Sequence, residues 1–132
     1  MRFVFPLLFA LLLLAGCGSR GPYPVAVQGI VTLDGAPLAE GVISFITPGQ
    51  VPEPVDIKNG TFSGKAKWGK RRIEIAAYRP YQIPPEIPAS MHSLMKGGQE
   101  NYLPDIYHTN STLSEEVVQS GPNKFEFKLL SK

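Results

Sequence analysis

The chain has 132 residues, of which 43% are hydrophobic and 18% are charged, and this length supports one domain with a modest hydrophobic core. Its 13 glycines and 13 prolines, set between short apolar runs, favour an all-β fold with many turns over disorder. The formal net charge of +2 is too small to indicate a nucleic-acid partner, and a single cysteine excludes an internal disulfide.

The amino-terminal segment has the pattern of an export signal. Met1-Arg2 is positive, and residues 3–15 form an apolar run that is shorter than the roughly 20 residues of a membrane-spanning helix. The run ends in the sequence LAGC, in which the cysteine is Cys17. This sequence resembles the lipobox of bacterial lipoproteins. The resemblance implies a signal peptide over residues 1–16, cleavage between Gly16 and Cys17, and a diacylglycerol thioether on the Cys17 sulfur.

The lipid anchor that this resemblance implies predicts where the protein resides. Buried acyl methylenes contribute about 0.8 kcal/mol each, so two or more chains hold a protein on a membrane stably. Gly18 stands where an aspartate retains proteobacterial lipoproteins at the inner membrane. We therefore expect a membrane-anchored protein of the cell envelope, in the outer membrane or on a periplasm-facing leaflet. Residues 17–24 form a short lipidated tether, which keeps the domain within roughly 25 Å of the bilayer.

The folded domain is expected to occupy residues 25–132 and to be organised around 27–47. This stretch predicts two strands joined by a turn at Asp34-Gly35, because glycine tolerates positive φ and aspartate bonds its own backbone. Pro37 argues against strand pairing within the connection. Two interpretations of Asp34-Gly35 remain open, an ordinary turn and a binding loop. The first strand is predicted from residues that alternate along it: Val25, Val27, Gly29, Val31 and Leu33.

The middle of the chain predicts further strands. Asn59-Gly60 is a strong hairpin turn between 55–58 and 61–63. Residues 65–79 are expected to include a strand whose inward side chains are Ile73, Ile75 and Ala77.

Residues 65–79 are also rich in lysine and arginine. One interpretation is a binding surface for anionic lipid headgroups or a polymer, on which aromatic side chains stack. The other is a solvated strand edge whose charges prevent pairing with another sheet. The candidate surface consists of Trp68, Tyr78, Lys67 and Arg71.

The segment 80–101 carries prolines that forbid regular structure through its first half. Residues 89–96 are compatible with one or two helical turns. Long loops of this kind are often functional, so this insert is a candidate for binding. Alternatively, its Tyr81, Met91 and His92 pack over the edge of the domain.

The carboxy-terminal third predicts strands over 114–119 and 124–130, with a turn over 120–123. The last strand has a clear period of two, with Phe125, Phe127 and Leu129 on one face. Such a regular terminal strand is expected to close the domain by pairing with an earlier strand.

Three motifs together resemble carboxypeptidase-regulatory-like, transthyretin-like domains. They are GIVTLDGAPLAEGVISF over 29–45, NGTF over 59–62, and WGK followed by IEI over 68–75, where Arg71 replaces the tyrosine typical of the family. The tail over 103–129 is similar to the end of small lipoproteins of environmental bacteria. The resemblance implies a transthyretin-like (prealbumin-like) Greek-key β-sandwich of about seven strands, and fold alone does not fix function.

No catalytic, metal or cofactor site is expected. His92 and His108 are the only histidines and lie far apart in the sequence, and no cysteine accompanies them. Enzymes of the transthyretin-like fold end in a motif that this chain lacks. We expect a structural or accessory protein that interacts with envelope partners. The alternative is a carbohydrate or peptidoglycan binding module, and a third possibility is an enzyme with a pocket in the 80–101 insert.

Overall fold

The computed structural model describes residues 21–132, and the fold is mostly β. The predictions on the signal peptide, on cleavage after Gly16 and on lipidation of Cys17 lie outside these residues. The elements are β1 (Pro24–Leu33), β2 (Ala36–Pro37), β3 (Glu40–Ile46), β4 (Glu53–Lys58), β5 (Thr61–Lys67), β6 (Gly69–Ala76), β7 (Tyr78–Pro80), η1 (Ala89–Met91), α1 (His92–Met95), β8 (Gln99–Asn101), η2 (Asp105–Tyr107), β9 (Ser114–Val117) and β10 (Lys124–Leu129).

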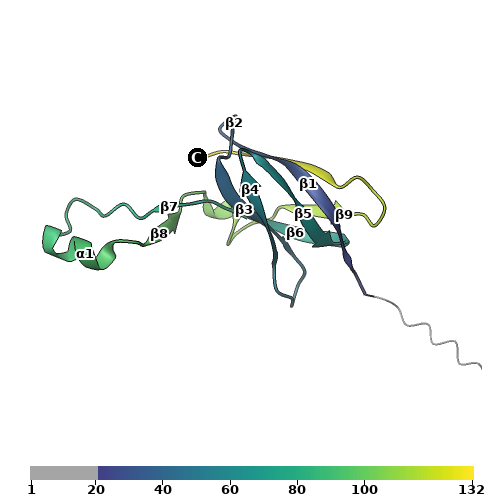
Figure 1. Cartoon of the computed structure of the whole chain (residues 1–132), viewed down its shortest axis with the longest axis horizontal. Helices are drawn as coiled ribbons and strands as arrows, with labels where there is room; N and C mark the ends of the chain where they lie inside the picture. The colour runs from purple at the N-terminus through teal and green to yellow at the C-terminus, as the bar shows by residue number, and fades with distance from the viewer. Residues whose placement is uncertain (1–20) are drawn as a thin grey trace, which may run out of the picture.

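One curled sheet forms the body of the molecule (Figure 1). Its strand order is β10-β1-β5-β4-β3-β6-β9, with β2 paired to β1. All neighbours are antiparallel except β1 and β10, which run parallel. The β4–β5 ladder comprises only Ile57↔Phe62 and Lys58↔Thr61, next to the Asn59-Gly60 turn. Because the two strands separate beyond this turn, the two halves of the sheet can close on one another.

The core lies inside this curl. The Phe45 ring on β3 lies 6.3 Å from the Phe62 ring on β5 and 6.1 Å from the Phe125 ring on β10, measured between centroids. These tilted contacts join strands from opposite ends of the sheet order in the geometry that aromatic pairs favour. The largest fully buried side chains are those of Phe45, Ile43, Ile57, Ile73, Ile75, Leu129, Val27, Val31 and Val117.

The predicted pairing of the first two long strands is wrong. Asp34 and Gly35 do form a turn with φ of 51° and 83°, but it joins β1 to the short β2. Pro37 takes part in that pairing, opposite Thr32, against the expectation drawn from its missing N–H. A two-residue edge strand tolerates proline at its solvent side. The strand β3 then crosses to the other half of the sheet, where it pairs with β4 and β6.

The stretch 65–79 contains two long strands, because the chain changes direction at Trp68 between β5 and β6. Gly69 has a φ of 113°, a value that glycine adopts readily and other residues rarely do. The predicted inward set of Ile73, Ile75 and Ala77 is confirmed, since all three are buried.

The terminal strand β10 pairs with the first long strand, as predicted, and its partner β1 runs parallel to it. Buried Asn123 directs this pairing. Its Nδ2 donates to the carbonyls of Val118 (2.9 Å) and Ala26 (3.1 Å), and its Oδ1 accepts from the Val118 N–H (2.8 Å). One side chain therefore joins the loop that follows β9 to β1, and this contact brings β10 beside β1 rather than beside β9.

Candidate functional site

Residues 78–101 form an arm that projects from the sheet (Figure 1). The arm consists of β7, a proline-rich segment, η1, α1 and β8. In Figure 1 it leaves the body at the end opposite the point where the described chain begins. None of the residues 78–101 is buried. Ordering a chain segment costs conformational entropy, and here no core contact of the arm itself offsets that loss. This combination is typical of segments retained for function.

The base of the arm is fixed to the body by hydrogen bonds. The Asn101 Oδ1 accepts from the backbone N–H groups of Ala77 (3.2 Å) and Leu103 (3.1 Å), both of which are buried. The Tyr102 N–H donates to the Ala77 carbonyl at 3.0 Å. These bonds set the direction in which β7 and β8 leave the sheet.

Arg79 adds electrostatic contacts at the base. Its Nε lies 2.7 Å from the Glu100 Oε1, and its guanidinium carbon lies 5.6 Å from the centroid of the Tyr102 ring. The arginine side chain is 50% exposed, so solvent screens the ion pair and its stabilisation is small. The pair fixes the side chains of β7 and β8 rather than the whole fold.

The outer part of the arm is held by its own backbone. The Tyr81 N–H donates to the Gly98 carbonyl at 2.9 Å, which continues the pairing of β7 with β8. Farther out, the His92 Nε2 lies 2.9 Å from the Ile87 carbonyl oxygen. The short helical turns predicted over 89–96 are confirmed as η1 and α1. The arm is therefore a structured projection with an internal hydrogen-bond network.

The far end of the arm exposes apolar side chains. Leu94 is 81% exposed and Met91 is 49% exposed, and we call these two residues the arm tip. Between Tyr81 and Met95 the only charged side chain is that of Glu86. Low charge with exposed methionine and aliphatic side chains is typical of the centre of a protein–protein interface. The arm can therefore place an apolar surface into a partner.

The structure does not bring Trp68 and Tyr78 together. They flank β6, Trp68 before its first residue and Tyr78 after its last. Tyr78 is 56% exposed, whereas Trp68 packs partly against the core with its edge toward Tyr23 at 6.5 Å. The Lys67 ammonium donates to the Gln50 Oε1 at 2.8 Å. A common stacking surface on these two aromatic rings is therefore not formed.

Arg71 lies inside the molecule rather than on a basic surface. It is 6% exposed, and its guanidinium donates to the carbonyls of Lys67 (3.0 Å), Lys70 (3.0 Å) and Trp68. A Cβ at Gly69 would lie 3.2 Å from the guanidinium, which shows how closely the side chain folds over this corner. Arg71 thus holds the corner between β5 and β6 and is not placed to bind a ligand.

Replacing Arg71 by lysine is expected to reduce the free energy of unfolding by about 2 kcal/mol, since a hydrogen bond from a charged group contributes about 1.5–3 kcal/mol. A lysine ammonium lacks the planar fork that reaches several carbonyls at once. Urea denaturation of both proteins measures the difference. Arg79→Lys, at a half-exposed ion pair, is the matched control and is expected to change stability by less than about 0.5 kcal/mol. Equal effects of the two substitutions would contradict this role of Arg71.

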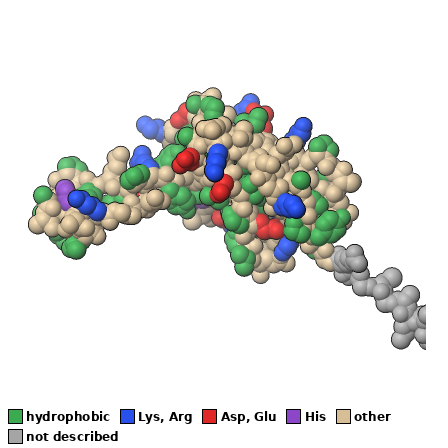
Figure 2. Space-filling model, in the orientation of Figure 1, with side chains coloured by type: hydrophobic (Ala, Val, Ile, Leu, Met, Phe, Trp, Pro, Cys, Tyr) green, Lys and Arg blue, Asp and Glu red, His purple; other side chains and the backbone are tan. Residues whose placement is uncertain are grey.

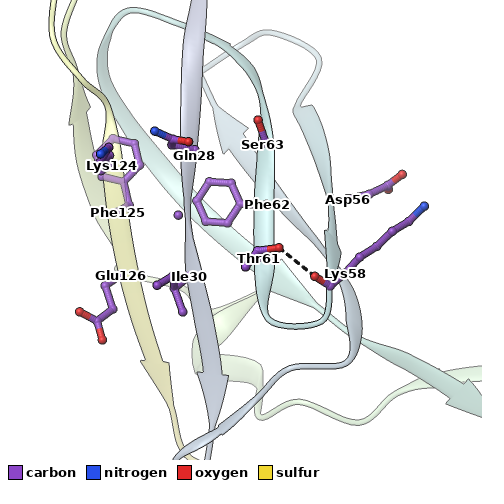
Figure 3. Close-up of a pocket in the computed structure, with 11 residues that line it drawn as sticks. Gln28, Ile30, Asp56, Lys58, Thr61, Phe62, Ser63, Lys124, Phe125 and Glu126 are labelled. Atoms are coloured by element: carbon purple, nitrogen blue, oxygen red, sulfur yellow. Dashed lines mark hydrogen bonds between the residues drawn. The ribbon is translucent and has the colours of Figure 1, made fainter.

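A groove of about 910 Å³ crosses the outer face of β10, β1, β5 and β4 (Figure 3). Two lysines and two acidic residues are mixed along it, and the Phe62 ring lies between the strands at its floor. This distribution gives no single charge preference and no convergent polar groups. The lining residues are Gln28, Gly29, Ile30, Asp56, Lys58, Thr61, Phe62, Ser63, Lys124, Phe125 and Glu126.

The carboxylate of Asp34 is engaged by the end of the chain. Its Oδ1 accepts from the Ser131 N–H at 2.9 Å, and hydrogen bonds from the Ser131 side chain and backbone lower the pKa of this carboxyl. The Asp34 N–H donates to the Leu129 carbonyl at 2.9 Å. These contacts favour the ordinary-turn interpretation of Asp34-Gly35 over a binding loop.

Within residues 21–132 no group of three or more His, Cys, Asp or Glu side chains is placed to hold a metal ion. The ring of His108 lies near Asp105, with its Nε2 3.3 Å from the carboxylate, whereas His92 is on the arm. Over the same described range, no helix has the length and apolar character needed to cross a bilayer. Neither a protein-family model, nor a curated protein, nor a solved structure matches the chain.

Proposed function

We propose that this chain is a lipid-anchored protein of the bacterial cell envelope with a structural or accessory interaction role. The sequence LAGC at the end of an apolar run supports the anchor, with Cys17 as the lipidated residue and Gly16 as the last residue of the leader. The proposal includes no catalysis. Its location is the outer membrane or another periplasm-facing leaflet.

The finer fold assignment is part of the same proposal. The motif over 29–45 that resembles transthyretin-like domains covers most of β1, all of β2 and most of β3. The Asn59-Gly60 motif coincides with the turn at which the sheet curls. These coincidences support a transthyretin-like Greek-key β-sandwich.

The arm is the element that we assign to the partner. The observation that carries this assignment is an ordered projection, residues 78–101, in which no side chain is buried and whose tip exposes Leu94. A protein with an apolar cleft is the partner that fits such a tip, because burial of apolar area supplies the driving force. Glycan binding through Trp68 and Tyr78 is less well supported, since β6 separates the two rings and Trp68 is partly buried.

The anchor is tested by replacing Cys17 with serine in the full-length chain. Wild-type protein is expected in the membrane fraction and in the detergent phase of a Triton X-114 partition. Cys17→Ser is expected in neither, because serine offers no thiol for the thioether. Wild-type protein that partitions into the aqueous phase would reject lipid anchoring.

A further inference from the structure

One pole of the molecule lies where the described chain begins. We call it the anchor pole and define it by Tyr23, Val51, Lys65, Lys67, Trp68 and Lys70. Only Gly18 to Pro22 stand between Cys17 and Tyr23 in the sequence. A chain spans at most about 3.6 Å per residue, so a lipid on Cys17 would hold this pole close to the bilayer.

Backbone and side-chain contacts assemble the pole from three segments. The Trp68 N–H donates to the Tyr23 carbonyl at 3.4 Å, and the two rings meet edge to face. The β1–β5 register places Lys67 opposite the first residue of β1. The Lys67 ammonium reaches the Gln50 Oε1 at 2.8 Å, which brings the loop between β3 and β4 to the same pole. The start of the chain, the β5–β6 corner and this loop therefore move as one unit.

Apolar side chains at this pole face solvent. Val51, in the loop between β3 and β4, is 85% exposed, more than any other large hydrophobic residue from 21 to 132. Tyr23 is 50% exposed, and Val118, which follows the partner of Gly69 on β9, is 43% exposed. Figure 2 shows hydrophobic side chains beside the point where the chain leaves the described part. A valine held out into water at a loop end is costly unless another phase covers it.

The charges of the pole are predominantly positive. Within the described residues, none of Lys65, Lys67 and Lys70 takes part in an ion pair. The carboxylate of Glu53 accepts the Lys67 backbone N–H at 3.1 Å, and Glu116 lies opposite Lys70 in the β6–β9 ladder. Lysines beside exposed apolar and aromatic side chains match the chemistry of an anionic membrane surface.

We propose that the anchor pole rests directly on the bilayer, with Val51 and Tyr23 at the level of the headgroups and the lysines against anionic lipids. This inference rests on the proposed lipid anchor. The anchor alone fixes a distance, whereas the pole fixes an orientation. Because the arm projects from the opposite end of the body (Figure 1), this orientation directs the arm tip away from the membrane.

The test uses the full lipidated chain in vesicles of phosphatidylethanolamine and phosphatidylglycerol. Val51→Cys and the control Leu94→Cys each carry an environment-sensitive dye, since the acylated Cys17 sulfur does not react. Lipids brominated near the headgroup are expected to quench the Val51 dye at least threefold more than the Leu94 dye. Trp68, the single tryptophan, gives an internal readout in the unlabelled protein.

The charge of the pole is tested by Lys65→Glu combined with Lys70→Glu. Quenching at Val51 is expected to fall about threefold while the protein still floats with the vesicles. Floating protein with equal quenching at Val51 and Leu94 would overturn the orientation alone. Protein that does not float would overturn the anchor, and the orientation with it. Quenching that is unchanged in the double variant would overturn the contribution of the lysines.

Discussion

Aspartate in place of both Met91 and Leu94 is expected to weaken binding of the partner at least tenfold, while the free energy of unfolding stays within about 0.5 kcal/mol of wild type. Neither side chain is buried in the free protein, so their loss removes no core contact. In a complex, each would bring an unpaired charge into an apolar interface, which is strongly unfavourable. Binding should therefore respond strongly to this pair of substitutions, and folding should not.

Site-specific photo-crosslinking measures this even though the partner has no name, because the crosslink captures whichever protein touches the arm tip. A photoreactive amino acid at Leu94 of the full-length chain is expected to give discrete adducts in the native envelope, and Met91→Asp is expected to suppress them. The matched control carries the same amino acid at Ile30, which is 50% exposed in the groove. Adducts at Ile30 together with none at Leu94 would show that the groove, rather than the arm, contacts the partner.

Alanine at Gly29 is expected to reduce the free energy of unfolding by about 3 kcal/mol, at the upper end of what overpacking usually costs. A Cβ at this position would lie 2.2 Å from the Phe125 carbonyl oxygen and 2.6 Å from the Phe62 ring. The close atom is part of the backbone, so relief requires β1 and β10 to move apart. Their parallel pairing closes the sheet, so this strain affects the whole fold. Urea denaturation followed by circular dichroism measures the loss.

Two other glycines provide graded controls for Gly29. A Cβ at Gly98 on the arm would meet nothing closer than the Tyr81 Cβ at 3.6 Å, so Gly98→Ala is expected to change stability by less than about 0.5 kcal/mol. A Cβ at Gly64 would meet the Val55 side chain at 2.8 Å, which can shift, so an intermediate loss is expected. Equal stability of the Gly29 and Gly98 variants would contradict the close approach of β1 and β10.

Local periodicity predicts which residues face the core, but it does not predict which strands pair. The alternation of Ile73, Ile75 and Ala77 is a property of one strand, and burial follows from it directly. The crossing of β3 away from β1 depends on packing between residues far apart in the sequence. The same holds for the parallel pairing of β10 with β1. No two-residue period contains that information.

The prolines and the length of the arm make it a candidate from the sequence, but they do not predict that it projects. Residues such as Tyr81 and Met91 fit equally well over the edge of a sheet, and only the packing of the whole domain separates these alternatives. Arg71 shows the opposite case. It alternates in phase with buried Ile73, so the period of two already indicates an inward side chain. Its place in a basic run nevertheless suggests an exposed surface.

The measurement that tests the lipid anchor most directly is the intact mass of the protein purified from its own membranes. The expected mass is that of a chain that begins at Cys17 and carries a diacylglycerol thioether and an acylated amine. A mass that retains residues 1–16, or one that corresponds to a free Cys17 thiol, would contradict the anchor.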